Sequence, residues 1–114
     1  MAELTFYTNP MSRGRIARWM LEETGADYET VFLRYGPEMQ AETYKAINPM
    51  RKVPAIVHKG QIITEGGAIC AYLADAFPEA DLAPAPADRA EYYRWLFFAA
   101  GPWEQASTNK AMGF

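Results

Sequence analysis

An apolar run that opens on a proline constrains this 114-residue chain more than any other feature. The run reads Pro-Ala-Ile-Val over residues 54–57 and directly follows Lys52 and Val53. Proline has no N–H to give to a sheet ladder, so a proline at the first position of a strand indicates a special backbone geometry. The bond before a proline is also the one at which a cis peptide costs little. A cis Val53-Pro54 bond would turn the N–H and C=O of Val53 outward, where they can pair with an extended peptide.

A second informative segment begins at Ile62, eight residues after Pro54, where a short strand leads directly into a helix. Glu65, Gly66 and Gly67 occupy the junction between the two. The first N–H groups of a helix have no partner within it, and the helix dipole favours negative charge there. The junction therefore offers a carboxylate for an ammonium group and backbone amides for a carboxylate.

Together these two segments resemble the glutathione site of the glutathione S-transferase family, because Lys-Val-Pro and Glu-Gly occur in the same order and at the same spacing. The resemblance is close over residues 3–78 and extends into the helix that follows. It implies that Val53 pairs with the cysteinyl residue of glutathione and that Glu65 holds the ammonium group. The amides of Gly66 and Gly67 would hold the γ-glutamyl carboxylate. The family usually has a hydroxyl residue where Gly66 stands, so only the backbone contact is expected here.

The glutathione thiol needs a group that stabilises its ionised form, and the sequence offers two. Family members with a serine or cysteine near the first helix are similar to residues 7–12 here, which favours Ser12. Other classes use a tyrosine at the end of the first strand, and the run 13–15 resembles those classes. However, the five residues that follow Tyr7 make the loop longer than in the tyrosine classes. Ser12 is therefore the predicted catalytic residue and Tyr7 the alternative, although serine is also a favoured helix N-cap.

The glycyl carboxylate of glutathione needs a cation, and Lys52 or Arg51 can supply one, as a point charge or as a fork. The resemblance thus implies a glutathione-binding set made of Ser12, Lys52, Val53, Pro54, Glu65 and Gly66. Glutathione would be a co-substrate. No cluster of histidine, cysteine and carboxylate residues has the spacing of metal ligands, so we expect no metal.

Apolar periodicity predicts four short strands and three helices in the first two-thirds of the chain. The strands are expected at residues 4–7, 28–33, 54–57 and 61–63. The helices are expected at residues 12–24, 37–47 and 66–77. Lys59-Gly60 suits a tight hairpin between the last two strands. The order β-α-β-α-β-β-α is that of the thioredoxin fold, an α/β architecture with helices on the faces of a mixed sheet.

The domain organisation follows from a proline-rich connector. We expect a thioredoxin-like, glutathione-binding domain at residues 1–78 and a semi-rigid linker at residues 79–87. Residues 88–114 would then form the first helix of an all-helical domain, opened by Asp88 and Glu91 as a capping pair. This helix is apolar nearly all round, which predicts burial on several sides. Family members normally continue into a complete all-helical domain.

Composition and charge indicate which partners and which cellular compartment to expect. The net charge of −3 gives no electrostatic reason to expect nucleic acid or an anionic membrane. Cys70 is the single cysteine, which predicts a reducing compartment and no internal disulfide. No stretch approaches the length that spans a membrane, and the N-terminus has no secretory signal pattern. We therefore expect a cytoplasmic protein.

Two functions from different classes follow from the resemblance. The first is a glutathione S-transferase, or its N-terminal part, which conjugates glutathione thiolate to a small electrophile in detoxification and acts as a homodimer. In the family, the last helix lies at the subunit interface beside the glutathione site, where Glu104 could reach toward the ligand. The alternative is a non-catalytic relative that serves as a protein-interaction scaffold. Retention of Lys52-Val53-Pro54 and Glu65-Gly66 favours the enzyme, because a scaffold has no need of a ligand site.

Overall fold

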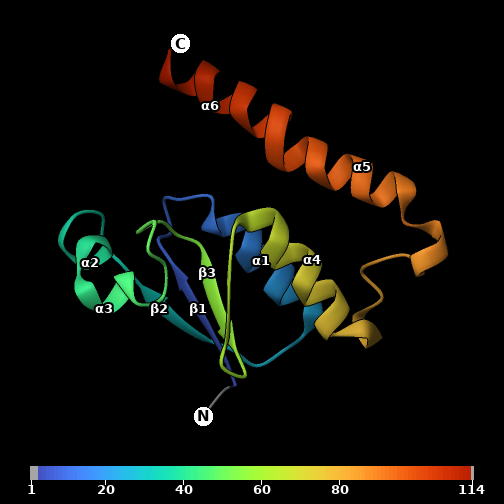
Figure 1. The fold of residues 1–114 in the computed structure, drawn as a ribbon, viewed down its shortest axis with the longest axis horizontal. Coiled ribbons are helices and arrows are strands. Elements are labelled where there is room, and N and C mark those ends of the chain that lie inside the picture. The colour runs from blue at the N-terminus through green and yellow to red at the C-terminus, as the bar shows by residue number, and fades with distance from the viewer. Residues whose placement is uncertain (1–2, 114) are drawn as a thin grey trace.

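A four-stranded mixed sheet forms the centre of the computed structural model, which describes residues 3–113 (Figure 1). Its strands are β1 (Leu4–Thr8), β2 (Glu29–Phe32), β3 (Ala55–His58) and β4 (Gln61–Thr64), in the order β2-β1-β3-β4. β1 is parallel to β2 and antiparallel to β3, and β3 is antiparallel to β4. The thioredoxin-like α/β fold predicted from the sequence is confirmed.

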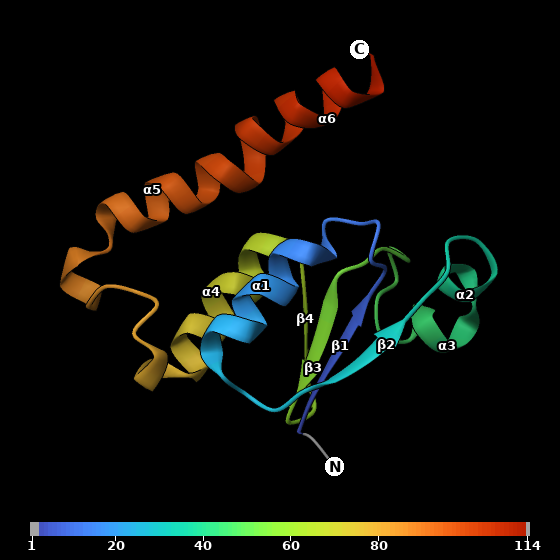
Figure 2. The same cartoon turned by 180° about the vertical axis from the view of Figure 1, so that it is seen from behind.

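Two helices of similar length cover one face of this sheet. α1 (Gly14–Thr24) and α4 (Gly66–Ala76) lie side by side on it, as Figures 1 and 2 both show. Between helices and sheet lies the core, made of Leu4, Phe6, Ala17, Leu21, Ile56, Ile69 and Leu73. The inward residues of β1 alternate with half-buried ones, which is the period that a strand with one buried face requires.

The predicted helix over residues 37–47 is wrong as a single element. The structure has two short helices, α2 (Pro37–Gln40) and α3 (Glu42–Lys45), separated by Ala41 in an extended conformation (φ −65°, ψ 149°). Met39 and Tyr44 are both buried. On one continuous helix, residues five apart would point about 140° away from each other. The break at Ala41 lets both side chains face the interior.

After α4 the chain leaves the sheet through two short 3₁₀ helices and enters a long helical segment. The 3₁₀ helices are Pro78–Ala80 and Pro86–Asp88. The long segment consists of α5 (Ala90–Phe98), a π-helical turn (Ala99–Trp103) and α6 (Glu104–Met112). We call residues 90–112 the helical arm. The π-turn contains Pro102, a residue type at which helices commonly become irregular. The division into domains at residues 78 and 88 stays a prediction.

Two expectations for this part of the chain are wrong. The helix begins at Ala90 without a side-chain cap, and the Glu91 carboxylate accepts a hydrogen bond from Trp95 Nε1 (2.9 Å) rather than capping. The arm is also not buried on several sides within this chain, because no residue of α5 is buried. Its exposed large side chains are Tyr93, Trp95, Phe97, Phe98, Trp103 and Met112.

Candidate functional site

A cleft of about 450 Å³ lies where the loop before β3, the start of α4, the start of α1 and the helical arm converge. Its lining includes five of the six predicted glutathione-binding residues, namely Lys52, Val53, Pro54, Glu65 and Gly66. The opposite side of the cleft is formed by Arg13 and Ile16 from α1 and its cap, and by Leu96, Ala99, Ala100 and Glu104 from the arm. The fold thus brings together two motifs that are separated in the sequence.

Val53 presents a free backbone edge to this cleft. The Val53-Pro54 peptide bond is cis, as the sequence suggested. Within the described residues, the backbone N–H and C=O of Val53 make no hydrogen bond. The preceding carbonyl, that of Lys52, accepts hydrogen bonds from the hydroxyl of Tyr44 and from Nδ2 of Asn48 (2.9 Å). The loop is therefore held at the Lys52 carbonyl, and the N–H and C=O of Val53 are left available for an extended ligand.

Asn48 is a site-shaping residue that sequence reasoning missed. Its side chain is buried, and besides the bond to Lys52 its Oδ1 accepts the backbone N–H of Met50 (3.0 Å). Its own carbonyl accepts the N–H of Arg51, a residue with a left-handed φ of 55°. An asparagine directly before a proline and next to a conformationally special loop was the available signal.

The two candidate cations for the glycyl carboxylate differ in their surroundings. Lys52 lines the cleft, is exposed, and has no carboxylate partner in the described part of the chain. Arg51 does not line the cleft, and its Nη2 lies 3.9 Å from a carboxylate oxygen of Glu42. Lys52 is therefore the cation free to meet an anionic ligand in the cleft.

Glu65 and Gly66 form the N-terminal boundary of α4. Glu65 is the N-cap residue, has φ 74° and ψ 121°, and its carbonyl accepts the N–H of Ile69 (2.9 Å). Its carboxylate is exposed and faces no cation within the described residues. A side chain at Gly66 would meet open space, whereas one at Gly67 would lie 3.1 Å from the Cβ of Ala100 in the arm. The start of α4 is thus open at the Cβ position of Gly66 and closely packed against the arm at Gly67.

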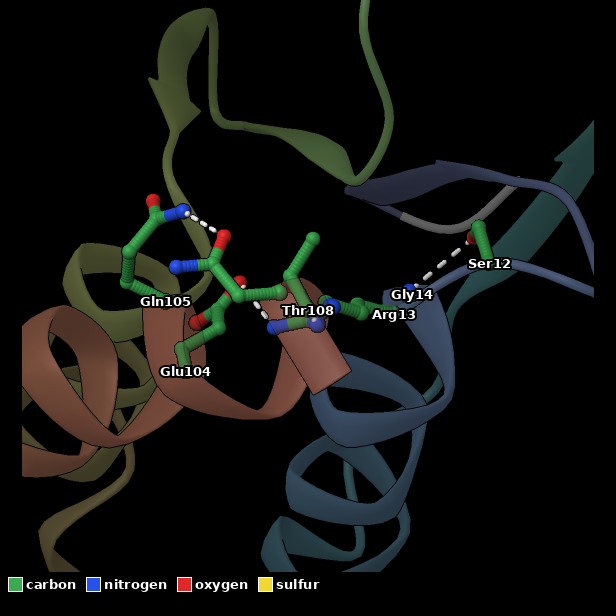
Figure 3. Close-up of polar contacts among 7 residues, drawn as sticks. Ser12, Arg13, Gly14, Glu104, Gln105 and Thr108 are labelled. Atoms are coloured by element: carbon green, nitrogen blue, oxygen red, sulfur yellow. Dashed lines mark hydrogen bonds and ion pairs between the residues drawn. The ribbon is translucent and has the colours of Figure 1, made fainter. Parts of the chain in front are cut away.

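Ser12 lies beside the cleft rather than in its lining. Its hydroxyl donates to the carbonyl of Asn9 (2.6 Å) and accepts the backbone N–H of Gly14 (3.0 Å), which Figure 3 shows in part. The side chain therefore stabilises the loop that leads into α1, close to the N-cap role that its sequence position allowed. Arg13, the next residue, lines the cleft. The catalytic assignment of Ser12 stays a prediction.

Tyr7 points to the sheet face opposite the core. Its ring packs against that of Tyr44, with the centroids 5.7 Å apart, and it does not line the cleft. Burial raises the pKa of Tyr44 to about 12, so its hydroxyl keeps the proton that it donates to the Lys52 carbonyl. Tyr7 thus belongs to the layer that supports the loop, and its alternative role at the thiolate also stays a prediction.

The arm is tied to α1 by a polar cluster at the mouth of the cleft. Arg13 Nη1 lies 2.7 Å from Glu104 Oε1, and Arg13 Nη2 donates to the hydroxyl of Thr108 (Figure 3). Arg13 is the N-cap residue of α1, and Glu104 is the first residue of α6. Both ends of this ion pair line the cleft.

Cys70 also lines the cleft, which the sequence analysis did not predict. The thiol is half-buried, and burial raises its pKa, so it stays protonated at neutral pH. Its position four residues after Gly66 places both on the same helix face, which was a usable signal. Among residues 3–113, no group of three or more histidine, cysteine or acidic residues could hold a metal, and no helix is both long and apolar enough to cross a membrane.

Comparison with known families bears directly on this site. The family model described as the glutathione S-transferase N-terminal domain matches residues 2–75. The chain belongs to the glutathione S-transferase family. The match runs from the first strand almost to the end of α4 and therefore includes both halves of the glutathione S-transferase motif, while the helical arm lies outside it.

Individual relatives of this glutathione S-transferase family member agree with that assignment. Protein LigF from Sphingobium sp. is 42% identical over 79 residues, which cover 66% of this chain and 31% of LigF. Glutathione S-transferase 3 from Zea mays is 35% identical over 102 residues, covering 84% of this chain and 45% of that protein. A solved glutathione transferase homologue from Sulfitobacter with bound glutathione has a TM-score of 0.78 at 31% identity, over 89% of this chain and 50% of that one. The chain thus spans half or less of each of these proteins.

Proposed function

We propose that this chain is a glutathione S-transferase, or the glutathione-binding part of one, that conjugates glutathione thiolate to a small electrophile. The observation that carries the proposal is the convergence of Val53, with its unpaired backbone, and the Glu65-Gly66 helix start in one cleft. The relative from Sulfitobacter holds glutathione on a similar fold. Glutathione carries two carboxylates, an ammonium group and a thiol, and the cleft offers a matching group for each charge.

The tripeptide would lie extended along the loop before β3. Its cysteinyl backbone would pair with the N–H and C=O of Val53, as an added strand does at a sheet edge. The ammonium group would meet the carboxylate of Glu65, and the γ-glutamyl carboxylate would meet the amides of Gly66 and Gly67. Lys52 would face the glycyl carboxylate. Open space at the Cβ position of Gly66 supports this pose, because it leaves room for a ligand at the start of α4.

The thiol would then point toward the N-terminus of α1. In this proposal Ser12 exchanges the hydrogen bond to the Asn9 carbonyl for one to the thiolate. The N–H groups at the start of α1 lower the thiol pKa by the same electrostatics that favour anions at helix N-termini. The thiolate attacks the electrophilic carbon, and a C–S bond forms. In a substitution, the leaving group departs with the electron pair of its bond to that carbon. In an addition, the electron pair of the broken π bond takes up a proton.

The setting of the reaction is also part of the proposal. We infer a cytoplasmic homodimer that acts in detoxification. Support for the compartment comes from a single, half-buried cysteine, and support for self-association comes from the exposed aromatic side chains of the arm. The rival function, a non-catalytic interaction scaffold, would show binding of glutathione without turnover, or no binding at all.

Calorimetric titration with reduced glutathione tests the proposal. The wild-type chain should bind, and Glu65→Ala should weaken binding by about tenfold or more, because a hydrogen bond to a charged group contributes roughly 1.5–3 kcal/mol. Glu79→Ala removes another exposed carboxylate, which lies outside the cleft lining, and should bind like wild type. Unchanged affinity in Glu65→Ala, with the fold intact by circular dichroism, would refute the assignment of this site.

A further inference from the structure

Polar contacts join the helical arm to the rest of the molecule at two places. Near its start, Arg89 Nη2 donates to Asp75 Oδ1 (3.0 Å), and Arg89 Nε donates to the carbonyl of Pro84 (2.9 Å). At the cleft, Arg13 pairs with Glu104 (2.7 Å). The arm has no buried residue in α5 or α6, so these polar contacts, together with the close approach of Ala100 to Gly67, set where it lies over the sheet domain.

Arg13 contacts α6 through two side chains, Glu104 and Thr108, and we call this pair of contacts the Arg13 grip. Glu104 and Thr108 are four residues apart on α6, so their side chains lie on the same helix face. The guanidinium of Arg13 reaches both of them, as Figure 3 shows. Its planar fork suits this arrangement, whereas a lysine ammonium would meet only one partner well. The grip fixes both the distance and the rotation of α6 relative to the start of α1.

The pairing also bears on what Arg13 can do chemically. Its charge is compensated at 2.7 Å by the Glu104 carboxylate, so its field at the thiol position is largely cancelled. A direct role as counter-charge to the thiolate is therefore disfavoured. The other possible role of Arg13 is structural, because it binds the arm, and the arm contributes Leu96, Ala99 and Ala100 to the cleft. These three apolar residues face the glutathione-binding wall made by Val53 and Glu65.

We propose that Arg13 is a positioning residue of the transfer site: through Glu104 and Thr108 it holds the arm in place as the apolar, electrophile-facing wall of the cleft. The inference rests on the proposed function and adds to it the contact that holds the arm in place. Without Arg13, Leu96, Ala99 and Ala100 would be held less firmly beside the glutathione-binding residues of the cleft.

Steady-state kinetics on the full chain, with a chlorodinitrobenzene as the electrophile, distinguish an effect on electrophile binding from an effect on glutathione binding. Arg13→Ala and Glu104→Gln should each raise the KM for the electrophile by about three- to fivefold, the range expected for a half-exposed ion pair. The affinity for glutathione and the pKa of its bound thiol should stay close to wild type. The exchange Arg13→Glu with Glu104→Arg should recover most of the loss. Arg94→Ala breaks an ion pair within α5 that lies outside the cleft and should change nothing.

Hydrogen exchange provides a readout that is independent of turnover. In Arg13→Ala, amides of residues 99–108 should exchange faster than in wild type, while those of β1 and β3 keep their protection. A lowered thiol pKa in Glu104→Gln with an unchanged KM for the electrophile would overturn the inference, since Arg13 would then act on the thiolate. Unchanged KM and unchanged exchange would overturn it as well. Failure of the wild-type chain to bind glutathione would instead refute the proposed function, and with it any role of Arg13 in transfer.

Discussion

Glu65 occupies a backbone region that L-residues rarely adopt, with φ 74° and ψ 121°. Such conformations cost about 1–3 kcal/mol and persist where the surrounding structure imposes them, often at functional sites. Here the strain turns the chain sharply from β4 into α4 and leaves the carboxylate exposed at the cleft. A glycine would meet the same backbone demand at lower cost. The presence of a glutamate therefore supports the proposed role of its side chain in ligand binding over a role in the fold.

This reasoning predicts a separation of stability from binding at residue 65. Glu65→Gly should raise the free energy of unfolding by up to about 1 kcal/mol, because relief of strain outweighs the extra freedom of the unfolded chain. The same variant should lose glutathione affinity as Glu65→Ala does. Thermal unfolding and calorimetry on the two variants test this. A Glu65→Gly protein that is markedly less stable than wild type would show that the turn needs the glutamate side chain.

The thiolate stabiliser is the second prediction at the residue scale. Ser12→Ala should raise the pKa of bound glutathione, because the thiolate loses a hydrogen-bond donor. Tyr7→Phe should leave that pKa nearly unchanged, because the Tyr7 ring packs against Tyr44 away from the cleft. Thiolate absorbance followed against pH measures both. Ser12→Ala also removes the hydroxyl that accepts the Gly14 N–H, so its fold must be checked by circular dichroism. The reverse pattern would assign the role to Tyr7.

At the scale of elements, the sequence was most informative where one local rule decided the outcome. Pro54 marked the start of a strand and a cis bond, and Glu65 to Gly67 marked the start of a helix; both are confirmed. The sequence was least informative where tertiary packing determined the local structure. The break at Ala41 depends on burying Met39 and Tyr44 together, and no glycine or proline next to Ala41 indicates a break in the helix. The inclusion of Arg13 in the cleft likewise depends on a contact with α6, 91 positions along the chain.

The contact between α1 and β1 gives a prediction at this scale. A Cβ on Gly14 would lie 1.9 Å from Thr8 Oγ1, which belongs to a buried, β-branched side chain with little freedom to move. Gly14→Ala should therefore destabilise the fold by about 1–3 kcal/mol, the usual cost of overpacking. Gly66→Ala is the matched control, because its Cβ meets open space, and it should be neutral or slightly stabilising. Equal denaturant midpoints for the two variants would contradict the close approach.

The whole molecule combines a well-packed sheet domain with an arm that leaves large aromatic side chains in solvent. Trp95, Phe97 and Trp103 are 51%, 69% and 63% exposed. The sequence indicated this conflict, since an all-round apolar helix needs covering on several sides, but it could not indicate what covers it. In the structure, the arm contacts the sheet domain through the partners of Arg13 and through Ala100 beside Gly67, whereas most of its aromatic side chains are exposed.

Self-association of this chain is the prediction that follows for the whole molecule. Monomeric proteins rarely expose contiguous apolar patches beyond a few hundred Å², so at micromolar concentration light scattering should give a mass above that of one chain. Replacing Phe97 and Trp103 by serine should shift the protein toward the monomer, because it removes the two most exposed aromatic side chains of the arm without touching the Arg13–Glu104 pair. Ile62→Ser changes an exposed apolar residue on β4 and serves as the control.

A soluble wild-type monomer that turns over an electrophile at an undiminished rate would refute this prediction. The arm would then tolerate its exposure, and the grip of Arg13 on α6 would suffice to complete the cleft within one chain.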